Sequence, residues 1–274
     1  MSCSDDSNTL IQLTGFSAYP LKIGNQWQYE HEIAVVNFQP SVPDTPFPGD
    51  TLILGTSTVE AVRMQTLPGG TETYVLHETF RETNQIWESE FHYRNEEDGL
   101  FIYATLGANS QSLPKSTSNP AKTRIQFIGK EFNSLPEMYA FFERALFSDL
   151  ALLDTLVIEN PPLQVLPFPT EVGQVWAYRE KGNPFLIEKS VIGKETVEVP
   201  AGEFECFKIQ WDLDFDNDGT PNQNIEFVDY ISARGLVKRT LIFRGLVITS
   251  ETGPEPVGSF DSQHDVLASV IQLN

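Results

Sequence analysis

The sequence has few cysteines and few basic residues, and both shortages limit what the chain can do. With only two cysteines, Cys3 and Cys206, it cannot form the disulfide framework of a small secreted domain. Lysine and arginine together number 18 against 38 acidic residues, so the net charge is −20. Nucleic acids and anionic lipid headgroups both attract basic residues. We therefore expect neither as a partner, and we expect a well-solvated, self-repelling surface.

A long apolar stretch is also lacking. The longest candidate, residues 138–158, is interrupted by Glu143, Arg144, Asp149 and Asp154, which is not the pattern of a membrane span. The start has no apolar signal-peptide core. However, residues 3–8, Cys-Ser-Asp-Asp-Ser-Asn, resemble the beginning of a mature bacterial lipoprotein, in which the first cysteine carries the lipid and a polar tether follows. We expect lipid attachment at Cys3; the alternative is an unmodified cysteine in a frayed terminus.

Catalytic signatures are missing as well, because no Gly-x-Ser-x-Gly elbow, phosphate loop or dinucleotide fingerprint occurs. The four histidines are His31, His77, His92 and His264, and no two form a His-x-x-x-His pair. The first three fall in expected strands and could converge on a metal, but packed or solvated histidines are the favoured interpretation. No catalytic residue is predicted, and we expect no enzymatic activity.

One pattern, in contrast, is present twice at matching spacing. Residues 19–29 and 168–178 share a proline, an aliphatic residue, a glycine, a tryptophan and a tyrosine at one constant offset. Later echoes follow in the same order: 67–70 with 199–202, and 99–101 with 235–237. Such a repeat indicates that one supersecondary unit is used twice.

The aromatic residues of this pattern are Trp27 and Tyr29 in the first copy and Trp176 and Tyr178 in the second. A pair that recurs in both units is expected in the core, because each unit needs its own core residues to fold, whereas a binding site need not be present twice. The alternative is an aromatic platform for a sugar or a lipid.

Alternating apolar and polar residues predict strands through most of the chain, as in 27–32, where Trp, Tyr and His alternate with Gln and Glu. Tight turns such as 68–70 and 200–202 separate these short strands, which favours antiparallel pairing. Proline-rich residues 39–50 predict a surface loop. The expected fold class is mainly β: an antiparallel, strongly curved sheet or half-barrel built from two similar units, with one amphipathic insertion helix.

The insertion helix is predicted from residues 134–137, Ser-Leu-Pro-Glu, which have the spacing of a capping box, and from apolar residues at helical spacing up to Leu153. It would run for about five turns, end before Pro161-Pro162 and pack on the concave face of the sheet. The expected segments are a tether at 1–15, a first β unit at 16–110, a linker and helix at 111–165, a second β unit at 166–250, and a C-terminal extension at 251–274.

Three motifs of the second unit carry a family resemblance. They are Gly-x-x-Trp-x-Tyr at 173–178, Val-Pro-Ala-Gly-x-Phe-x-Cys at 199–206 and Gly-Leu-Val at 235–237. With them, residues 167 to about 245 resemble a group of poorly characterised bacterial secreted proteins and lipoproteins, whereas the first unit lacks the Phe-x-Cys part. The resemblance implies a β-rich envelope protein with a curved sheet like that of lipoprotein-carrier proteins. It brings no activity and no catalytic residues.

Residues 214–219, Asp-Phe-Asp-Asn-Asp-Gly, match the opening half of a calcium-binding loop. Alternate carboxylates point at one centre, and hard oxygen ligands suit calcium rather than zinc. An EF-hand would place its glutamate at the position of Ile225, one residue earlier than the glutamate found here. The alternative is a polar hairpin tip. The predicted ligands of a structural calcium ion are Asp214, Asp216, Asp218, Thr220 and Glu226.

The expected function is that of a non-enzymatic envelope protein, anchored through the lipid on Cys3 in the bacterial periplasm or on the cell surface. It would bind an unknown ligand or another envelope protein, and meet the membrane only through its anchor. The alternatives are an extracellular glycan hydrolase and a lipid or lipoprotein carrier with an apolar concave pocket. A deep apolar pocket would favour the carrier, and two convergent carboxylates in an aromatic cleft would favour the hydrolase.

Overall fold

A computed structural model describes residues 15–41, 53–82, 85–107, 123–135, 137–139, 141–142, 155–180, 186–250 and 253–274. Cys3 and most of the proline-rich loop lie outside these residues. Most of the described residues lie in strands, which are β1 (Gln26–Pro40), β2 (Ile53–Thr66), β3 (Glu72–Glu82), β4 (Gln85–Asn95), β5 (Gly99–Leu106), β6 (Thr123–Phe127), β7 (Lys130–Phe132), β8 (Leu156–Pro167), β9 (Val175–Arg179), β10 (Leu186–Val199), β11 (Gly202–Asp214), β12 (Ile225–Ser232), β13 (Gly235–Ser250) and β14 (Gly253–Gln272).

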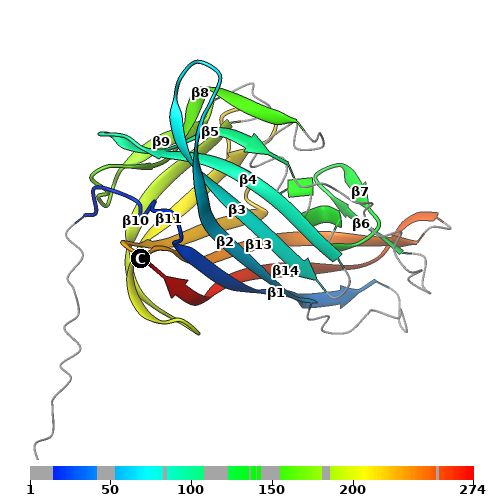
Figure 1. Ribbon diagram of the computed structural model, residues 1–274. Helices are drawn as coiled ribbons and strands as arrows, with labels where there is room; N and C mark the ends of the chain where they lie inside the picture. Colours follow the sequence, from blue (N-terminus) through cyan, green and yellow to red (C-terminus); the bar gives the residue numbers. More distant parts are fainter. Residues whose placement is uncertain are drawn as a thin grey trace, which may run out of the picture.

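The strands form one sheet in the order β8-β5-β4-β3-β2-β1-β14-β13-β12-β11-β10-β9, and the short β6 pairs with β13 and β7. Neighbouring strands run antiparallel. Figure 1 shows that the sheet curls round on itself, so that its end strands β8 and β9 approach each other. The indole of Trp176 on β9 donates to the carbonyl of Gln164 on β8 at 2.9 Å. The prediction of a mainly β protein with a strongly curved antiparallel sheet is confirmed.

Strand β1 shows how the sequence sets the two faces of the sheet. Its buried and less buried residues alternate, because successive side chains of a strand point to opposite faces. The first buried residue is Trp27 and the last is Val35, and the polar His31 lies on this same inner face. The inner face is therefore mainly apolar, but it also carries polar side chains.

The sheet consists of two runs of neighbouring strands. One run is β1 to β5 followed by β8, and the other is β9 to β13 followed by β14. β14 pairs with β13 on one side and with β1 on the other, so it joins the two runs. The C-terminal extension predicted at 251–274 is therefore a central strand of the sheet, and not an edge element.

The two copies of the sequence motif fold into the same turn. Gly24 and Gly173 both have positive φ, at 87° and 95°, which glycine adopts without a steric penalty. The amide of Gly24 donates to the carbonyl of Ala61 at 2.8 Å, and the amide of Gly173 donates to the carbonyl of Val191 at the same distance. In each copy, the carbonyl of the residue after the glycine accepts a hydrogen bond of 2.9 Å from the neighbouring strand. The donors are the amides of Ala61 and Val191. Each motif therefore fixes the start of its strand against the strand that follows.

The interior of the curved sheet contains two clusters of buried apolar residues. One cluster includes Trp27 and Phe207, and the other includes Phe142 and Phe243, whose rings lie 4.7 Å apart. Burying an aromatic or aliphatic side chain of this size contributes about 1.5–3 kcal/mol to folding. These clusters fill much of the concave face of the sheet.

A helical segment packs against the concave face, as predicted. Residues 135, 137–139 and 141–142 are helical, and Phe142 is 1% exposed within the core. Ser134 Oγ accepts from the amide of Glu137 at 3.3 Å, and the Glu137 carboxylate accepts from the amide of Asn133 at 2.7 Å, so the capping residues satisfy free amides at the start of the helix. Residues 143–154 lie outside the described part of the chain, so the length of about five turns stays a prediction. Among the described residues, no helix is long and apolar enough to cross a membrane.

The sequence analysis missed strand β8, because it placed residues up to 165 in a linker and helix. Pro161 and Pro162 pointed away from a strand, since proline cannot donate to a sheet ladder. The structure accommodates both prolines between two register pairs, Ile102 with Leu163 and Ala104 with Ile158. β8 also lies at one end of the sheet, where proline is tolerated because one side of the strand needs no ladder.

Candidate functional site

Several charged and polar side chains lie on the inner face of the sheet. Lys189 shows the pattern: it lies between Ile187 and Val191 in the alternation of β10, and both neighbours are core residues. Asp229 and Arg239 are directly opposed on β12 and β13, and opposed residues share a face of the sheet. We call this set the inner polar group, and its members are His31, Ser57, Glu78, Glu159, Tyr178, Arg179, Lys189, Asp229, Arg239 and His264.

Lys189 is 1% exposed and lies between two aromatic rings. Its Nζ is 3.5 Å from the centre of the Trp211 ring and 4.0 Å from that of Tyr178, and it donates to the carbonyl of Val165 at 3.4 Å. Burial lowers the pKa of Lys189 well below its ordinary value, although the carboxylate of Asp229 acts to raise it. Cation–π contacts of a desolvated ammonium contribute about 2 kcal/mol, which offsets only part of the desolvation.

Asp229 is held by three donors. Arg239 donates from Nε at 2.7 Å and from Nη2 at 3.0 Å, and the indole of Trp211 donates at 3.0 Å. This two-pronged contact is the strong form of an arginine–carboxylate pair. Asp229 is therefore an anchor for Arg239 and Trp211, and its oxygens already accept from both.

Two histidines continue the inner polar group on β1 and β14. His31 Nδ1 lies 3.1 Å from His264 Nε2, and His31 Nε2 lies 2.8 Å from the hydroxyl of Ser57. Burial lowers the pKa of His31 well below its ordinary value and lowers that of His264 to about 4, and the charge of Arg239 acts in the same direction on both. Both imidazoles are therefore neutral at pH 7.

Glu78 gives this chain of hydrogen bonds a direction. Burial raises the pKa of Glu78, against Arg239 and the hydrogen bond from Ser57. When the Glu78 carboxylate is ionised it can only accept, so in that state the Ser57 hydroxyl donates to Glu78 and accepts from His31 Nε2–H. His31 Nδ1 then accepts from His264. The proton of Ser57 is thus directed at a carboxylate, and no imidazole lone pair is left to remove it.

Arg179 and Glu159 form a buried ion pair between β9 and β8. The Arg179 side chain is 3% exposed, and its Nη2 lies 3.8 Å from Glu159 Oε1. That distance gives an attraction between charges but is too long for a hydrogen bond. Arg179 Nε, Arg179 Nη2 and the hydroxyl of the adjacent Tyr178 have no hydrogen-bond partner in the structure.

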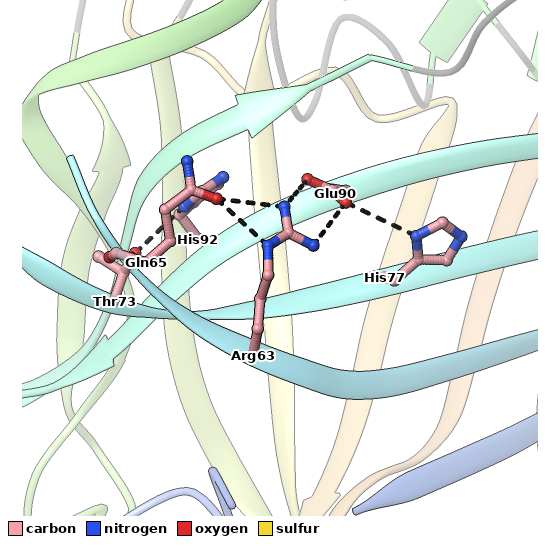
Figure 2. Close-up of polar contacts among 6 residues, drawn as sticks. All are labelled: Arg63, Gln65, Thr73, His77, Glu90 and His92. Atoms are coloured by element: carbon pink, nitrogen blue, oxygen red, sulfur yellow. Dashed lines mark hydrogen bonds and ion pairs between the residues drawn. The ribbon is translucent and has the colours of Figure 1, made fainter. Parts of the chain in front are cut away.

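A second polar cluster lies on β2, β3 and β4 and is partly exposed (Figure 2). Arg63 donates to Glu90 with both terminal nitrogens, at 3.0 and 2.7 Å, and also contacts Gln65. His77 lies on the other side of Glu90, at 3.7 Å. The hydrogen bond with Arg63 is the largest cause that lowers the pKa of Glu90. Glu90 is thus occupied by two basic partners, which makes this cluster a surface network that links three strands.

The predicted calcium ligands are brought together only in part. Asp214, Asp216 and Asp218 can place one oxygen each within 4.8 Å of one another, and they are the only group of three or more potential metal ligands of this kind among the described residues. Thr220 donates its amide to the Asp218 carboxylate at 2.7 Å. Glu226 forms an ion pair with Arg244 and is not part of the group.

The first acid of this loop is folded into the turn. Asp214 is 2% exposed and accepts from the amides of Gly219 at 2.7 Å and of Asp218 at 3.2 Å. Burial acts to raise the pKa of Asp214, but these amides and Asp216 outweigh it and leave the pKa below its ordinary value. Backbone amides therefore already stabilise the turn through one carboxylate.

The four histidines do not converge on one metal. His31 contacts His264, while His77 contacts Glu90 and His92 contacts the hydroxyl of Thr73 at 3.1 Å. The aromatic residues of the motif are core or core-facing, since Trp27, Tyr29 and Tyr178 are buried and Trp176 packs against a core cluster.

The sequence analysis missed the inner polar group. A signal was present, because Lys189, Asp229 and Arg239 each lie two residues from apolar neighbours on both sides, which places them on the apolar face. A charge on such a face is unusual and marks a candidate functional position. The contacts between these residues could not be found from the sequence, because they join strands that are distant along the chain.

A cavity of about 390 Å³ lies between the C-terminal end of β1 and the middle of β13 and β14. It is lined by Asn37, Phe38, Gln39, Gly245, Ser259, Phe260 and Asp261. Asp261 fixes its wall by accepting from the side chain of Asn37 and from the amide of Gly245, both at 2.8 Å. This cavity is separate from the inner polar group, since they share no residue.

Similarity to known proteins is limited to part of the chain or to weak structural likeness. A family model described as DUF3108-like matches residues 181–240. No curated protein matches the chain. A candidate exported protein with a YmcC-like fold from Bacteroides fragilis is 13% identical, with a TM-score of 0.32, and the match covers 94% of this chain and 99% of that chain. A candidate lipoprotein from Parabacteroides distasonis is 10% identical, with a TM-score of 0.34, and the match covers 95% and 100%.

Proposed function

We propose that this protein is a non-enzymatic lipoprotein of the bacterial envelope that binds a ligand or partner through the inner polar group. Cys3 would hold it at the membrane, and the sheet would be a rigid frame built from two copies of one unit. The lipoprotein-like residues 3–8 support the anchor. The matching turns at Gly24 and Gly173 support the duplication.

The observation that carries the binding role is the burial of Lys189 and Arg179 with few hydrogen-bond partners. Both side chains are almost fully buried, and Arg179 leaves Nε and Nη2 without a partner. A buried polar group without a partner costs about 1–3 kcal/mol. Replacing buried charges with apolar residues is often neutral or stabilising. A purely structural interior gains less from these residues than from apolar side chains, whereas a binding site gains donors that can bind a ligand.

The carrier alternative needs a deep apolar cavity. Trp27, Phe142 and Phe243 fill the concave side of the sheet and are at most 1% exposed. The cavity of about 390 Å³ lies beside the end of β1, and its lining includes polar residues such as Asn37 and Asp261. These observations favour a binding role over the carriage of a lipid.

The hydrolase alternative needs two carboxylates that are free to act as acid and base. In the described interior, Asp229 accepts from Arg239, and Glu159 faces Arg179. With Glu78 ionised, Ser57 directs its proton to Glu78, and it then does not have the geometry of a nucleophile activated by His31. We therefore expect a fluorophosphonate probe to leave Ser57 unlabelled; labelling that Ser57→Ala abolishes would instead support a hydrolase.

The binding role can be tested by native mass spectrometry of the full chain, produced in a bacterial envelope and released without denaturation. We expect the wild type to carry an additional mass that Lys189→Met loses. Lys194→Met is the matched control, because Lys194 lies on the same strand at an exposed position. A wild-type spectrum with the polypeptide mass alone would contradict the proposal.

The anchor can be tested separately, by labelling bacteria with radioactive palmitate. A chain exported with a lipoprotein signal peptide in front of Cys3 is expected to take up label, and Cys3→Ser is expected to lose it. Label that persists in Cys3→Ser would contradict attachment at this residue. The buried thiol of Cys206 serves as an internal comparison, because burial raises its pKa to about 12 and keeps it unreactive.

The loop at Asp214 is proposed to hold a structural calcium ion through Asp214, Asp216 and Asp218, with Thr220 contributing from the same turn. An ion that binds only the folded state raises the melting temperature. We expect the melting temperature to be higher in calcium than in chelator by roughly 2–4 °C for each kcal/mol gained. Asp216→Asn is expected to remove this difference, and equal melting temperatures for the wild type would contradict the calcium site.

A further inference from the structure

Arg179 is the last residue of β9, and a bulge turns it toward the interior. In the register between β9 and β10, Arg179 is opposite Ile187 and Ala177 is opposite Glu188, so Tyr178 is the extra residue. Ile187 is 0% exposed in the core, and opposed residues share a face. The ring of Tyr178 also packs inside, 5.1 Å from the ring of Trp211. Two consecutive side chains, Tyr178 and Arg179, therefore both point inward.

The donors that Arg179 leaves unpaired are Nε and Nη2. These two nitrogens form one edge of the planar guanidinium, and their N–H bonds are parallel. This edge matches two oxygens of a carboxylate or a phosphate. Glu159 is 3.8 Å from Nη2, so it balances the charge of Arg179 but makes neither hydrogen bond. The geometry leaves a free two-pronged oxyanion site.

The Tyr178 hydroxyl is a third unpaired donor, on the residue next to Arg179. It is buried and has no partner in the structure. Burial raises the pKa of Tyr178 well above its ordinary value, so the hydroxyl keeps its proton. Among charged groups, Arg179 and Glu159 act most strongly on the pKa of this hydroxyl. The group is then able to donate to an oxygen that Arg179 binds.

We take the seam between β8 and β9 as the entry route for a ligand. These strands are the two ends of the sheet, and among the described strands no backbone ladder joins them. Side chains bridge them instead: the Trp176 indole donates to Gln164 and the Lys189 ammonium donates to Val165. Unpaired strand edges and side-chain bridges open more easily than a ladder of backbone hydrogen bonds.

We propose that Arg179 and Tyr178 bind an oxyanion, a carboxylate or a phosphate group of the ligand, that enters between β8 and β9. This inference rests on the binding role proposed above and specifies the chemical class of the ligand. Arg179 holds two oxygens through Nε and Nη2, and Tyr178 donates to one of them. Glu159 weakens the site, because its negative charge repels the bound anion.

The test titrates sodium acetate and, separately, inorganic phosphate against the full chain at constant ionic strength, with chloride as the balancing salt. Isothermal calorimetry measures the affinity, and the melting temperature measures folding. We expect saturable binding to the wild type and, for Arg179→Lys, about tenfold weaker binding, because lysine keeps the charge but loses the fork. We expect about threefold weaker binding for Tyr178→Phe, which loses one hydrogen bond. The stronger of the two titrations identifies the carboxylate or the phosphate as the source.

Glu159→Gln separates this proposal from a purely structural ion pair. If Arg179 serves to bind an oxyanion, removing the charge of Glu159 is expected to tighten acetate or phosphate binding about tenfold. Arg81→Lys is the matched control and is expected to change nothing, because Arg81 is exposed on β3. If Arg179→Lys does not fold, Tyr178→Phe and Glu159→Gln still test the site.

The proposal is overturned if no titration saturates, if binding is equal in Arg179→Lys and the wild type, or if Glu159→Gln binds no more tightly. In each case, an additional mass in the native spectrum that Lys189→Met removes would keep the binding role and reject only the ligand class. If that mass is also missing, both proposals fail.

Discussion

The two motif copies form the same turn and strand but have different neighbours. β1 hydrogen-bonds to strands on both sides, β2 and β14, whereas β9 pairs with β10 alone among the described strands. Trp27 is fully buried, and its indole donates to the carbonyl of Arg234 at 2.7 Å. Trp176 makes the corresponding bond, to Gln164 at 2.9 Å, but remains partly exposed.

The tyrosines show what this difference means. The Tyr29 hydroxyl donates to the carbonyl of Leu236 at 3.2 Å, while the Tyr178 hydroxyl, at the same place in the second copy, is buried without a partner. The same local sequence thus gives the same local structure, but the neighbouring strand decides whether its polar groups are satisfied. The tyrosine hydroxyl of the first copy is hydrogen-bonded, whereas that of the second copy is unpaired near the end of β9, a strand that no backbone ladder joins to β8 among the described strands. This is why we place the binding site at the second copy.

The largest effect is expected from Trp27→Ala, compared with Trp176→Ala. Truncating a fully buried tryptophan costs about 3–5 kcal/mol of unfolding free energy, because it removes apolar contacts and leaves a cavity. Trp176 is partly exposed, so its truncation is expected to cost about half as much. Urea unfolding followed by circular dichroism measures both. Equal losses of unfolding free energy would show that the two tryptophans are equally buried, and would contradict the proposed difference between the two copies.

The next effect is a dependence of stability on pH. It concerns His31, on the strand of the first copy, and its neighbour His264 on β14. Burial lowers the pKa of His264 to about 4, and that of His31 falls in the same direction. In the unfolded chain these histidines bind protons below about pH 6.5, whereas the folded protein keeps them neutral. The unfolding free energy therefore has its full value above that pH and falls as the pH drops toward 4. For His264 the loss is on the order of 3 kcal/mol.

The measurement is the unfolding free energy of wild type and His264→Gln between pH 7 and pH 4. Glu78, whose pKa burial raises, acts in the opposite direction, so the comparison with the variant isolates the histidine. His77→Gln is the matched control, because His77 is partly exposed and belongs to the second polar cluster, beside Glu90. A pH slope that is the same in His264→Gln and in the wild type would contradict the assignment.

Much of the fold follows from the sequence because it is encoded locally. Gly24 and Gly173 specify their turns, and the alternation after each tryptophan specifies a strand with an inner face. Strand β8 could not be predicted, because Pro161 and Pro162 oppose a strand unless their unpaired positions in the register are known. The central place of β14 depends on long-range pairing, which no local pattern specifies.

The candidate site follows from the sequence to a smaller extent. Alternation alone places Lys189 and Arg239 on the inner face. It does not reveal that Arg179 also turns inward, because that depends on a bulge against β10. The free edge of the guanidinium is visible only once the distance to Glu159 is known.

A smaller effect is expected from the paired variants Tyr29→Phe and Tyr178→Phe. Tyr29→Phe removes the donor to the carbonyl of Leu236 and is expected to cost about 1 kcal/mol of unfolding free energy. Tyr178→Phe removes a hydroxyl that has no partner, so it is expected to leave the unfolding free energy unchanged or to raise it slightly. Urea unfolding of both variants in chloride buffer measures the difference. Equal losses would mean that the Tyr178 hydroxyl is satisfied in the folded protein.

The smallest effect is expected at the bulges that follow the two motif turns. β2 shifts register between Ala61 and Arg63, and β10 shifts in the same way between Val191 and Gly193. In the first bulge the residue after the extra one is Arg63, which pairs with Glu90 at 2.7 Å, and in the second it is Gly193. Because the Arg63 side chain is 45% exposed, Arg63→Ala is expected to cost only about 0.5–1 kcal/mol, and less at high salt. Urea unfolding at low and high salt measures this loss. A loss as large as that of Trp27→Ala would show that the second polar cluster is essential to the stability of the first copy.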